Sequence, residues 1–160
     1  MTTFAFRPLT PADEPFLWDM LYLALYVPPG QPVLPRDVLR HPQISRYVER
    51  WGQADDMGLL ALDGNRPVGA AWLRLLTGEN RGYGYVDETT PELSIAVLPE
   101  YRGRGVGSAL MARLLESARS RFAAVCLSVS PGNPARRLYE RLGFQVANDE
   151  PPSITMIKRY

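Results

Sequence analysis

The stretch "EYRGRGVGSALM" (residues 100–111) constrains the fold more than any other part of this chain. It places three glycines at every second position, directly before residues that favour a helix. Since each glycine costs roughly 1 kcal/mol relative to alanine inside a helix, these residues oppose the element that they introduce. The alternating pattern of "ELSIAV" (residues 92–97) precedes the stretch, and Pro99 ends that strand. We therefore expect a strand, a glycine loop and a helix in direct succession.

A glycine loop of this kind suits a phosphate group. The bare backbone exposes successive N–H groups at the positive end of a helix dipole. Arg102 and Arg104 add charge and a fork geometry that matches phosphate oxygens. Two other phosphate loops fit poorly, because the Walker loop needs a Gly-Lys-Ser/Thr ending and the dinucleotide fingerprint needs a glycine where Ser108 stands. The stretch predicts a pyrophosphate cradle, with a glycine-rich turn that binds nothing as the alternative.

The hydrophobic pattern predicts a single α/β domain over residues 1–160. We expect strands near residues 4–7, 57–62, 67–76, 92–97, 123–129, 143–147 and 153–160, and helices near 11–26, 44–51, 106–118 and 134–142. The order is β-α-α-β-β-β-α-β-α-β-β, and residues 92–129 form a β-α-β unit. This order predicts a mixed, mostly antiparallel sheet with helices on both faces.

The composition excludes several classes of protein. A formal net charge of +1 argues against binding to nucleic acid or to an anionic membrane, and no basic and apolar leader or membrane span stands in the sequence. We therefore expect a cytoplasmic protein. The single cysteine, Cys126, excludes an intrachain disulfide, and its place in a strand predicts a buried, unreactive thiol. His41 is the only histidine in the sequence and Lys158 the only lysine. We therefore expect neither a metal site nor a Schiff-base lysine.

Two motifs resemble the GNAT superfamily of N-acetyltransferases. "RGRGVG" (102–107) matches that family's Arg/Gln-x-x-Gly-x-Gly/Ala motif, and "NPARRLYERLGF" (133–144) matches the segment two elements later. The resemblance covers about residues 57–148 and is looser at the N-terminus. It implies the GNAT-like fold, acetyl-CoA as the acyl donor, no metal, and direct transfer of the acetyl group to an amine acceptor. It leaves open whether the chain forms a homodimer.

The resemblance also implies where CoA binds. Backbone groups of Ile95, Val97 and Leu98 would bond to the pantetheine arm. The pyrophosphate would lie on the main chain of Arg102, Gly103, Arg104, Gly105, Val106 and Gly107, together with Ser108. Asn133 has a side chain that either meets the pantetheine or caps the next helix before Pro134, and one residue could do both. Arg136, on that helix, is the last expected CoA contact.

Tyr139 and Glu92 are the expected catalytic residues. Tyr139 resembles the family tyrosine that protonates the departing sulfur, although its place on an apolar helical stripe also suits a core tyrosine. A backbone N–H near Val97 would stabilise the oxyanion. Glu92 is a candidate base, yet it stands one position from the strand carboxylate of the histone-acetylating branch. Asp87, Glu88 and a water chain are its rivals, and a structural Glu92 is a further alternative.

The acceptor amine stays open at this level. By analogy, a substrate wall would lie at the Pro-rich loop 27–35 and at the aromatic residues Tyr22, Tyr26, Trp72, Tyr83 and Tyr85, unless these only pack. A neutral chain favours a small amine or amino acid over a histone-like or ribosomal tail. The alternative function is a GNAT-like module that binds acyl-CoA as a sensor or partner domain without turnover.

Overall fold

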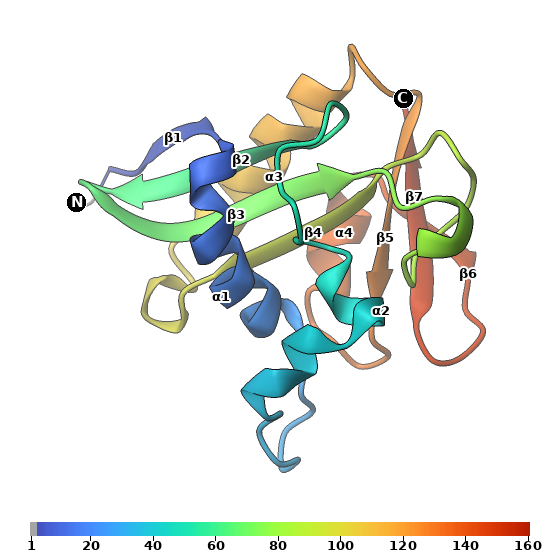
Figure 1. Ribbon diagram of the computed structural model, residues 1–160. Coiled ribbons are helices and arrows are strands. Elements are labelled where there is room, and N and C mark those ends of the chain that lie inside the picture. The colour runs from blue at the N-terminus through green and yellow to red at the C-terminus, as the bar shows by residue number, and fades with distance from the viewer. Residues whose placement is uncertain (1–2) are drawn as a thin grey trace.

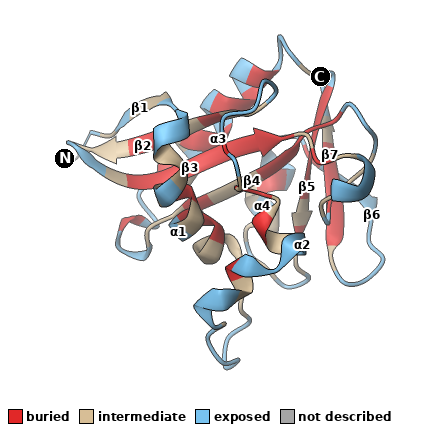
Figure 2. Cartoon of the chain, in the orientation of Figure 1, coloured by how far each residue is buried: buried red, intermediate tan, exposed pale blue. Residues whose placement is uncertain are grey.

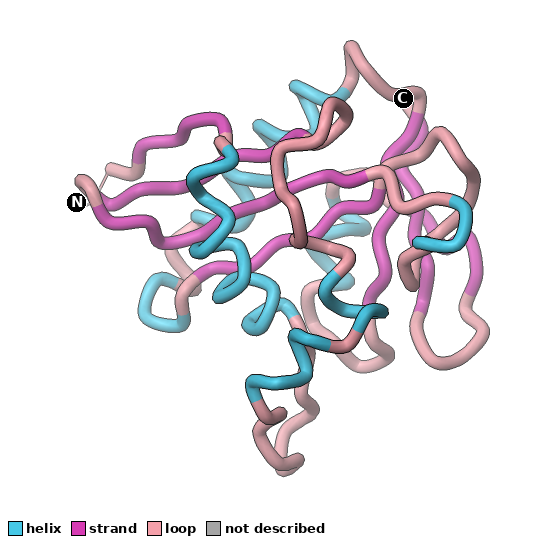
Figure 3. The backbone as a smooth tube through the Cα atoms, viewed as in Figure 1, coloured by secondary structure: helices cyan, strands magenta, loops and turns pink. Residues whose placement is uncertain are grey.

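A computed structural model describes residues 3–160 and shows one seven-stranded mixed sheet with helices packed against it (Figure 1). The strands are β1 (Ala5–Pro8), β2 (Met57–Asp63), β3 (Arg66–Arg74), β4 (Glu92–Val97), β5 (Ala124–Val129), β6 (Gln145–Asn148) and β7 (Ile154–Arg159). The helices are α1 (Glu14–Ala24), α2 (Pro42–Ser45), α3 (Val106–Ala118) and α4 (Arg136–Arg141). The expected order of strands and helices is confirmed (Figure 3).

The strands lie in the order β1-β2-β3-β4-β5-β7-β6. Within the described part of the chain only β4 and β5 are parallel, and α3 connects them, so the expected β-α-β unit and the mostly antiparallel sheet are both confirmed. In the described residues no helix is long and apolar enough to cross a lipid bilayer.

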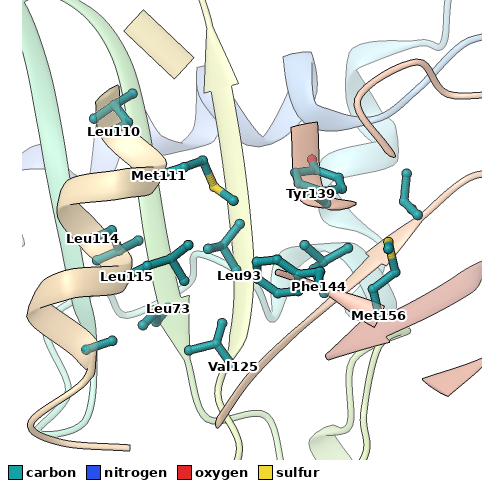
Figure 4. Close-up of a cluster of buried hydrophobic side chains, with 14 of the residues drawn as sticks. Leu73, Leu93, Leu110, Met111, Leu114, Leu115, Val125, Tyr139, Phe144 and Met156 are labelled. Atoms are coloured by element: carbon teal, nitrogen blue, oxygen red, sulfur yellow. The ribbon is translucent and has the colours of Figure 1, made fainter. Parts of the chain in front are cut away.

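Hydrophobic cores lie on both faces of the sheet. One contains Leu110, Leu114 and Met111 of α3 with Leu93 of β4 and Phe144 (Figure 4). The other lies beneath α1 and α2 and holds the largest fully buried side chain, that of Trp72. Central strands are therefore buried on both sides, whereas the loops at the strand ends are exposed (Figure 2).

Helix boundaries differ from the expected ones where a tertiary contact interrupts the helix. The predicted helix 44–51 is wrong in extent, because α2 ends at Ser45 and turns follow it. The carbonyls of Arg46, Glu49 and Arg50 accept hydrogen bonds from the buried guanidinium of Arg74 at 2.7–3.1 Å. Carbonyls that bond to a side chain of the sheet are held in turns rather than in a regular helical ladder.

The helices α1 and α4 begin later than expected, whereas α3 has its expected bounds of 106–118. Residues 11–13 form a 3-10 turn before α1, and the Asp13 carboxylate accepts the backbone N–H of Thr10 at 2.8 Å. α4 starts at Arg136 instead of Pro134, after a turn in which the Asn133 side chain accepts the N–H of Ala135. The Asn133 side chain therefore bonds within the turn before α4, whereas the helix itself begins at its N-cap Ala135 without a side-chain cap.

Candidate functional site

The parallel strands β4 and β5 separate beyond their first paired residues. Glu92 is paired with Cys126, and over the described residues the two strands show no later pair. Leu98 donates its N–H to the Val68 carbonyl at 2.8 Å, on the β3 side. Because backbone groups alternate along a strand, the N–H and C=O groups of Ile95 and Val97 point the other way, into the gap.

The expectation for Leu98 is therefore wrong with respect to its N–H group, because that group is already bonded within the sheet. Ile95 and Val97 keep backbone groups directed into the gap, so an extended ligand could bond there as an added strand does. The gap between β4 and β5 is the first part of the candidate site.

The glycine loop forms the second part. Gly103 and Gly105 adopt φ values of 76° and 82°, a left-handed conformation that favours glycine, and α3 begins directly after them. The first helical bond runs from the Ala109 N–H to the Gly105 carbonyl. From residue 103 to residue 108, the N–H groups donate to no backbone acceptor in the described part of the chain. Free N–H groups at a helix N-terminus have the arrangement that suits an anion.

The predicted contribution of the Arg102 N–H is wrong, since it donates to the Pro99 carbonyl at 3.2 Å. Its side chain lines the cleft beside the loop, where Nε donates to the Val97 carbonyl at 3.2 Å. The side chain of Arg104 lies over the Tyr101 ring, 5.0 Å from its centroid, and does not line the cleft.

Arg136 also lies outside the cleft lining, although we expected it to contact CoA. It is half-buried and lies 3.9 Å from the carboxylate of Glu140 on the same helix. Its position on α4 directs it to its own helix neighbour, so the structure gives this expectation no support.

An open cleft of about 1120 Å³ runs along the loop and the gap. Its walls come from the glycine loop, β4, the segment before α4 and the end of α1 with the Pro-rich loop; they include Val97, Gly105, Ser108, Asn133, Tyr26 and Leu34. A smaller cavity of about 370 Å³ adjoins it and shares Ile95, Asn133 and Tyr139 with it. A long ligand in the cleft could thus present one end to the smaller cavity, which we call the inner cavity.

Glu92 lines the inner cavity and is the only acidic residue among residues 3–160 that does so. Its side chain is 4% exposed. One carboxylate oxygen accepts the Tyr47 hydroxyl at 2.5 Å, and the other accepts the Gly84 N–H at 3.1 Å. Burial raises the pKa of Glu92 to about 7, against a partly offsetting effect of these hydrogen bonds. A carboxyl group with such a pKa can exchange a proton near neutral pH.

Tyr139 lines both the cleft and the inner cavity. Its ring packs edge-on against Phe144, 6.1 Å between centroids, at the border of the hydrophobic core (Figure 4). Its hydroxyl makes no hydrogen bond with the described residues, and burial raises its pKa to about 12. Tyr139 is therefore a core residue through its ring and keeps a protonated hydroxyl free for a ligand.

The rival carboxylates lie elsewhere. Asp87 and Glu88 are exposed, and neither lines the cleft or the inner cavity. Asp87 accepts the Thr89 N–H, which lowers its pKa, and Glu88 accepts the Tyr85 hydroxyl at 2.8 Å. Of the candidate substrate-wall aromatics, Tyr26 and Tyr83 line the inner cavity and Tyr22 lines the cleft, whereas Trp72 and Tyr85 line neither.

Sequence reasoning missed Tyr47, whose hydroxyl links Glu92 to the loop over the cavity. Besides donating to Glu92, this hydroxyl accepts the N–H of Tyr83 at 2.8 Å. The two glycines of "RGYG" (residues 81–84) indicate a close approach of the loop to another segment. A Cβ on Gly82 would lie 2.2 Å from the Glu92 carboxylate. Likewise, a Cβ on Gly84 would lie 2.7 Å from the backbone of β5. These glycines let the loop approach the carboxylate closely.

A model of the acetyltransferase (GNAT) family matches residues 18–144. A search of curated protein sequences found no match.

Solved structures with the same fold cover nearly the whole chain. PaiA N-acetyltransferase from Thermoplasma acidophilum, in complex with coenzyme A, superimposes with a TM-score of 0.70 at 16% identity, over 99% of each chain. YncA from Salmonella typhimurium, with its cofactor acetyl-CoA, gives 0.69 at 18% identity, over 99% of this chain and 94% of the other. A GCN5-related N-acetyltransferase from Kribbella flavida gives 0.67 at 21% identity, over 98% of each chain. At these identities the likeness establishes the fold.

Proposed function

The chain belongs to the acetyltransferase (GNAT) family, and on this premise we propose that it moves an acetyl group from acetyl-CoA directly to a primary amine. The acceptor would be the amine of a small molecule, an amino acid or a peptide. One observation carries the proposal: Glu92 and Tyr139 line the same inner cavity, which opens onto the cleft beside the glycine loop. A base and an acid thus meet where the end of a ligand in that cleft would lie.

The fit of acetyl-CoA to the cleft is supported by backbone groups that lack protein partners. The N–H groups of residues 103–108 suit the pyrophosphate, and a Cβ at Gly103 or Gly105 would meet no atom within 4 Å, so the loop is open on its outer side. The backbone of Ile95 and the N–H of Val97 suit the amides of the pantetheine arm, whereas the Val97 carbonyl already accepts Arg102 Nε at 3.2 Å. Asn133, which lines the cleft and the inner cavity, stays a proposed contact of that arm.

When bound, acetyl-CoA supplies a thioester whose C–S bond breaks as a C–N bond to the amine forms. Glu92 takes one proton from the incoming ammonium, directly or through water, and later releases it to solvent. The N–H of Val97, directed into the gap, stabilises the negative charge that develops on the carbonyl oxygen. Tyr139 donates a hydrogen bond to the departing sulfur, which leaves as a thiolate, and the thiolate takes up the second proton of the new amide nitrogen.

Tyr139 should contribute less to the reaction rate than Glu92. A thiol with a pKa near 8.5 is a better acid than a tyrosine with a pKa of about 12, so the thiolate leaves readily without full proton transfer. The hydroxyl would act mainly by donating a hydrogen bond to the sulfur as charge develops there. We therefore expect a moderate rate effect from Tyr139 and a larger one from Glu92.

The test is a measurement of CoA thiol release from acetyl-CoA in the presence of a panel of amines, amino acids and peptides, with mass spectrometry of the products. Amine-dependent thiol release, with the acetyl group recovered on the amine, is the expected result. CoA binding by calorimetry without turnover of any acceptor would favour the acyl-CoA sensor instead. An acetyl group trapped on Cys126 would contradict direct transfer, and the burial of that thiol, which raises its pKa, argues against this outcome.

A further inference from the structure

The inner cavity carries a single formal charge. Glu92 is its only charged lining residue, and no arginine, lysine or histidine lines it in residues 3–160. Arg46 lies close enough to lower the pKa of Glu92 slightly, but its guanidinium donates to the carbonyls of Pro42 and Arg81 and does not line the cavity. Arg102, the charged residue of the neighbouring cleft, lies beside the glycine loop.

A carboxylate on the acceptor would therefore have no cation to pair with. It would also lie close to the buried carboxylate of Glu92, which carries the same charge. Bringing an unpaired charge out of water beside a like charge is strongly unfavourable. The lining thus opposes free amino acids.

A second ammonium group on the acceptor would likewise lack a partner. Glu92 offers one carboxylate, and its two oxygens already accept hydrogen bonds from Tyr47 and Gly84. The nearby acids of the loop, Asp87 and Glu88, are exposed and bonded to other groups. The lining can therefore hold one cationic nitrogen, and it opposes a polyamine.

The remaining walls suit an uncharged body. Apolar and aromatic side chains come from α1, α2 and the loops over the cavity: Leu21, Leu25, Tyr26, Ile44 and Tyr83. On the opposite side the hydroxyls of Ser128 and Ser153 are bonded to each other at 2.9 Å, so they do not require a polar ligand. Its volume of about 370 Å³ lies at the small end of the usual range for ligand pockets.

We infer that the acceptor is a small primary monoamine with an apolar or aromatic body and without an acid group. This inference rests on the proposed function and narrows its acceptor. Glu92 receives the amine as the one charged partner in the cavity, and Leu21, Leu25 and Ile44 pack against the body. Selectivity comes from the absence of a second charged partner, which penalises acceptors with a further charge.

Two pairs of amines test the inference, because the members of each pair differ by one charged group. 2-Phenylethylamine and L-phenylalanine differ by a carboxylate, and pentylamine and cadaverine differ by a second amine. We expect kcat/KM to be larger for 2-phenylethylamine and for pentylamine, by roughly 100-fold or more over the partner amine, as measured by thiol release at pH 8. Similar values within either pair, or a preference for L-phenylalanine or cadaverine, would overturn the inference.

A charge added to the lining should change the selectivity. Ile44→Glu places a second carboxylate in the cavity and should shift the kcat/KM ratio toward cadaverine by roughly tenfold or more. Gln145→Glu is the control, because it adds the same charge at an exposed position of β6 that lines neither the cleft nor the inner cavity. It should leave the ratio unchanged. An equal shift in both variants would show that the cavity lining does not set the preference.

Failure of the inference is distinguishable from failure of the proposed function. Turnover of cadaverine or L-phenylalanine at the rate of its partner overturns the inference and leaves acetyl transfer standing. If the protein binds CoA but acetylates no amine of the panel, the proposed function fails and the inference fails with it. If Ile44→Glu does not fold, the two ratios of the unaltered protein still decide the question.

Discussion

Replacing Glu92 by glutamine separates its two effects, one on catalysis and one on stability. The substitution keeps the size of the side chain and removes its ability to ionise. The amide oxygen can still accept the Gly84 N–H. The Tyr47 hydroxyl, which already accepts the Tyr83 N–H, has a second lone pair for the amide N–H. The variant should therefore keep the fold and the Gly84 contact, while the Tyr47 hydroxyl proton loses its carboxylate acceptor.

The magnitude follows from the raised pKa. The carboxyl pKa moves from 4.5 to about 7 on folding, a difference of about 2.5, which at 1.36 kcal/mol for each pKa unit corresponds to about 3 kcal/mol. Because the folded pKa is the higher one, this stability is fully present below pH 4.5 and is lost as the pH rises through about 7. Glu92→Gln has no carboxyl group at this position, so its stability lacks this pH dependence.

The variant should therefore gain stability relative to the unaltered protein as the pH rises. Between pH 4.5 and pH 8 we expect the difference in free energy of unfolding to change by about 3 kcal/mol in favour of Glu92→Gln. At roughly 2–4 °C for each kcal/mol in a chain of this size, the change in Tm difference is about 6–12 °C. Urea denaturation at several pH values measures the first quantity, and calorimetric melting measures the second.

Activity should move in the opposite direction. If Glu92 is the base, kcat/KM of the unaltered protein falls below a pH of about 7, where the carboxylate is protonated. Glu92→Gln should lower kcat/KM by roughly 10²- to 10⁴-fold and abolish this pH limb. A variant that is more stable at pH 8 and less active has lost a group whose burial serves the reaction.

Glu88→Gln is the matched control for both measurements. It removes the same charge from an exposed position outside the cavity, where the amide can replace the contact with Tyr85. It should change neither the pH dependence of stability nor the activity profile. The reasoning is refuted if the Glu92→Gln difference in stability is independent of pH, or if the acid limb persists in Glu92→Gln and disappears in Glu88→Gln.

Four further substitutions test other parts of the protein. Tyr139→Phe keeps the ring packing, so kcat should fall roughly 10- to 100-fold while calorimetric CoA affinity stays constant; lost stability with unchanged kcat would make the hydroxyl structural. Gly105→Ala forces a side chain onto a residue with φ of 82° and should weaken CoA binding about tenfold or more. Gly107→Ala, whose Cβ would meet side chains of β4 at ordinary distances, should keep the affinity and stabilise the protein by about 0.5–1 kcal/mol, and equal affinities in both variants would contradict the cradle. Arg74→Ala leaves the buried carboxylate of Asp56 without its cationic partner and should lower the free energy of unfolding by about 3–5 kcal/mol, as measured by urea denaturation. A loss below about 1 kcal/mol would show that the pair does not anchor the turns after α2.

Local patterns in the sequence determined the order of the elements and the position of the cradle. The sequence by itself predicts that Gly105 lies in a loop, because the free-energy cost of glycine inside a helix is a property of the residue and depends on no distant contact. The alternation of Leu93, Ile95 and Val97 likewise depends only on the pleat of a strand, and these side chains do pack on the α3 side of the sheet. Family resemblance then indicated CoA and Tyr139, and the match to the family confirms the class of protein.

Only the tertiary structure decided which hydrogen-bonding groups are available to a ligand and which are already bonded within the protein. Leu98 was expected to offer a backbone group to CoA and Arg102 its N–H, yet the N–H groups of both donate to carbonyls of neighbouring segments. The end of α2 depends on Arg74, a residue of β3. Tyr47 meets Glu92 although 45 positions separate them in the chain. Propensity and periodicity act over a few residues, whereas a buried hydrogen bond depends on which distant segments pack together, and that packing makes Glu92 a buried carboxyl group with a pKa near neutrality.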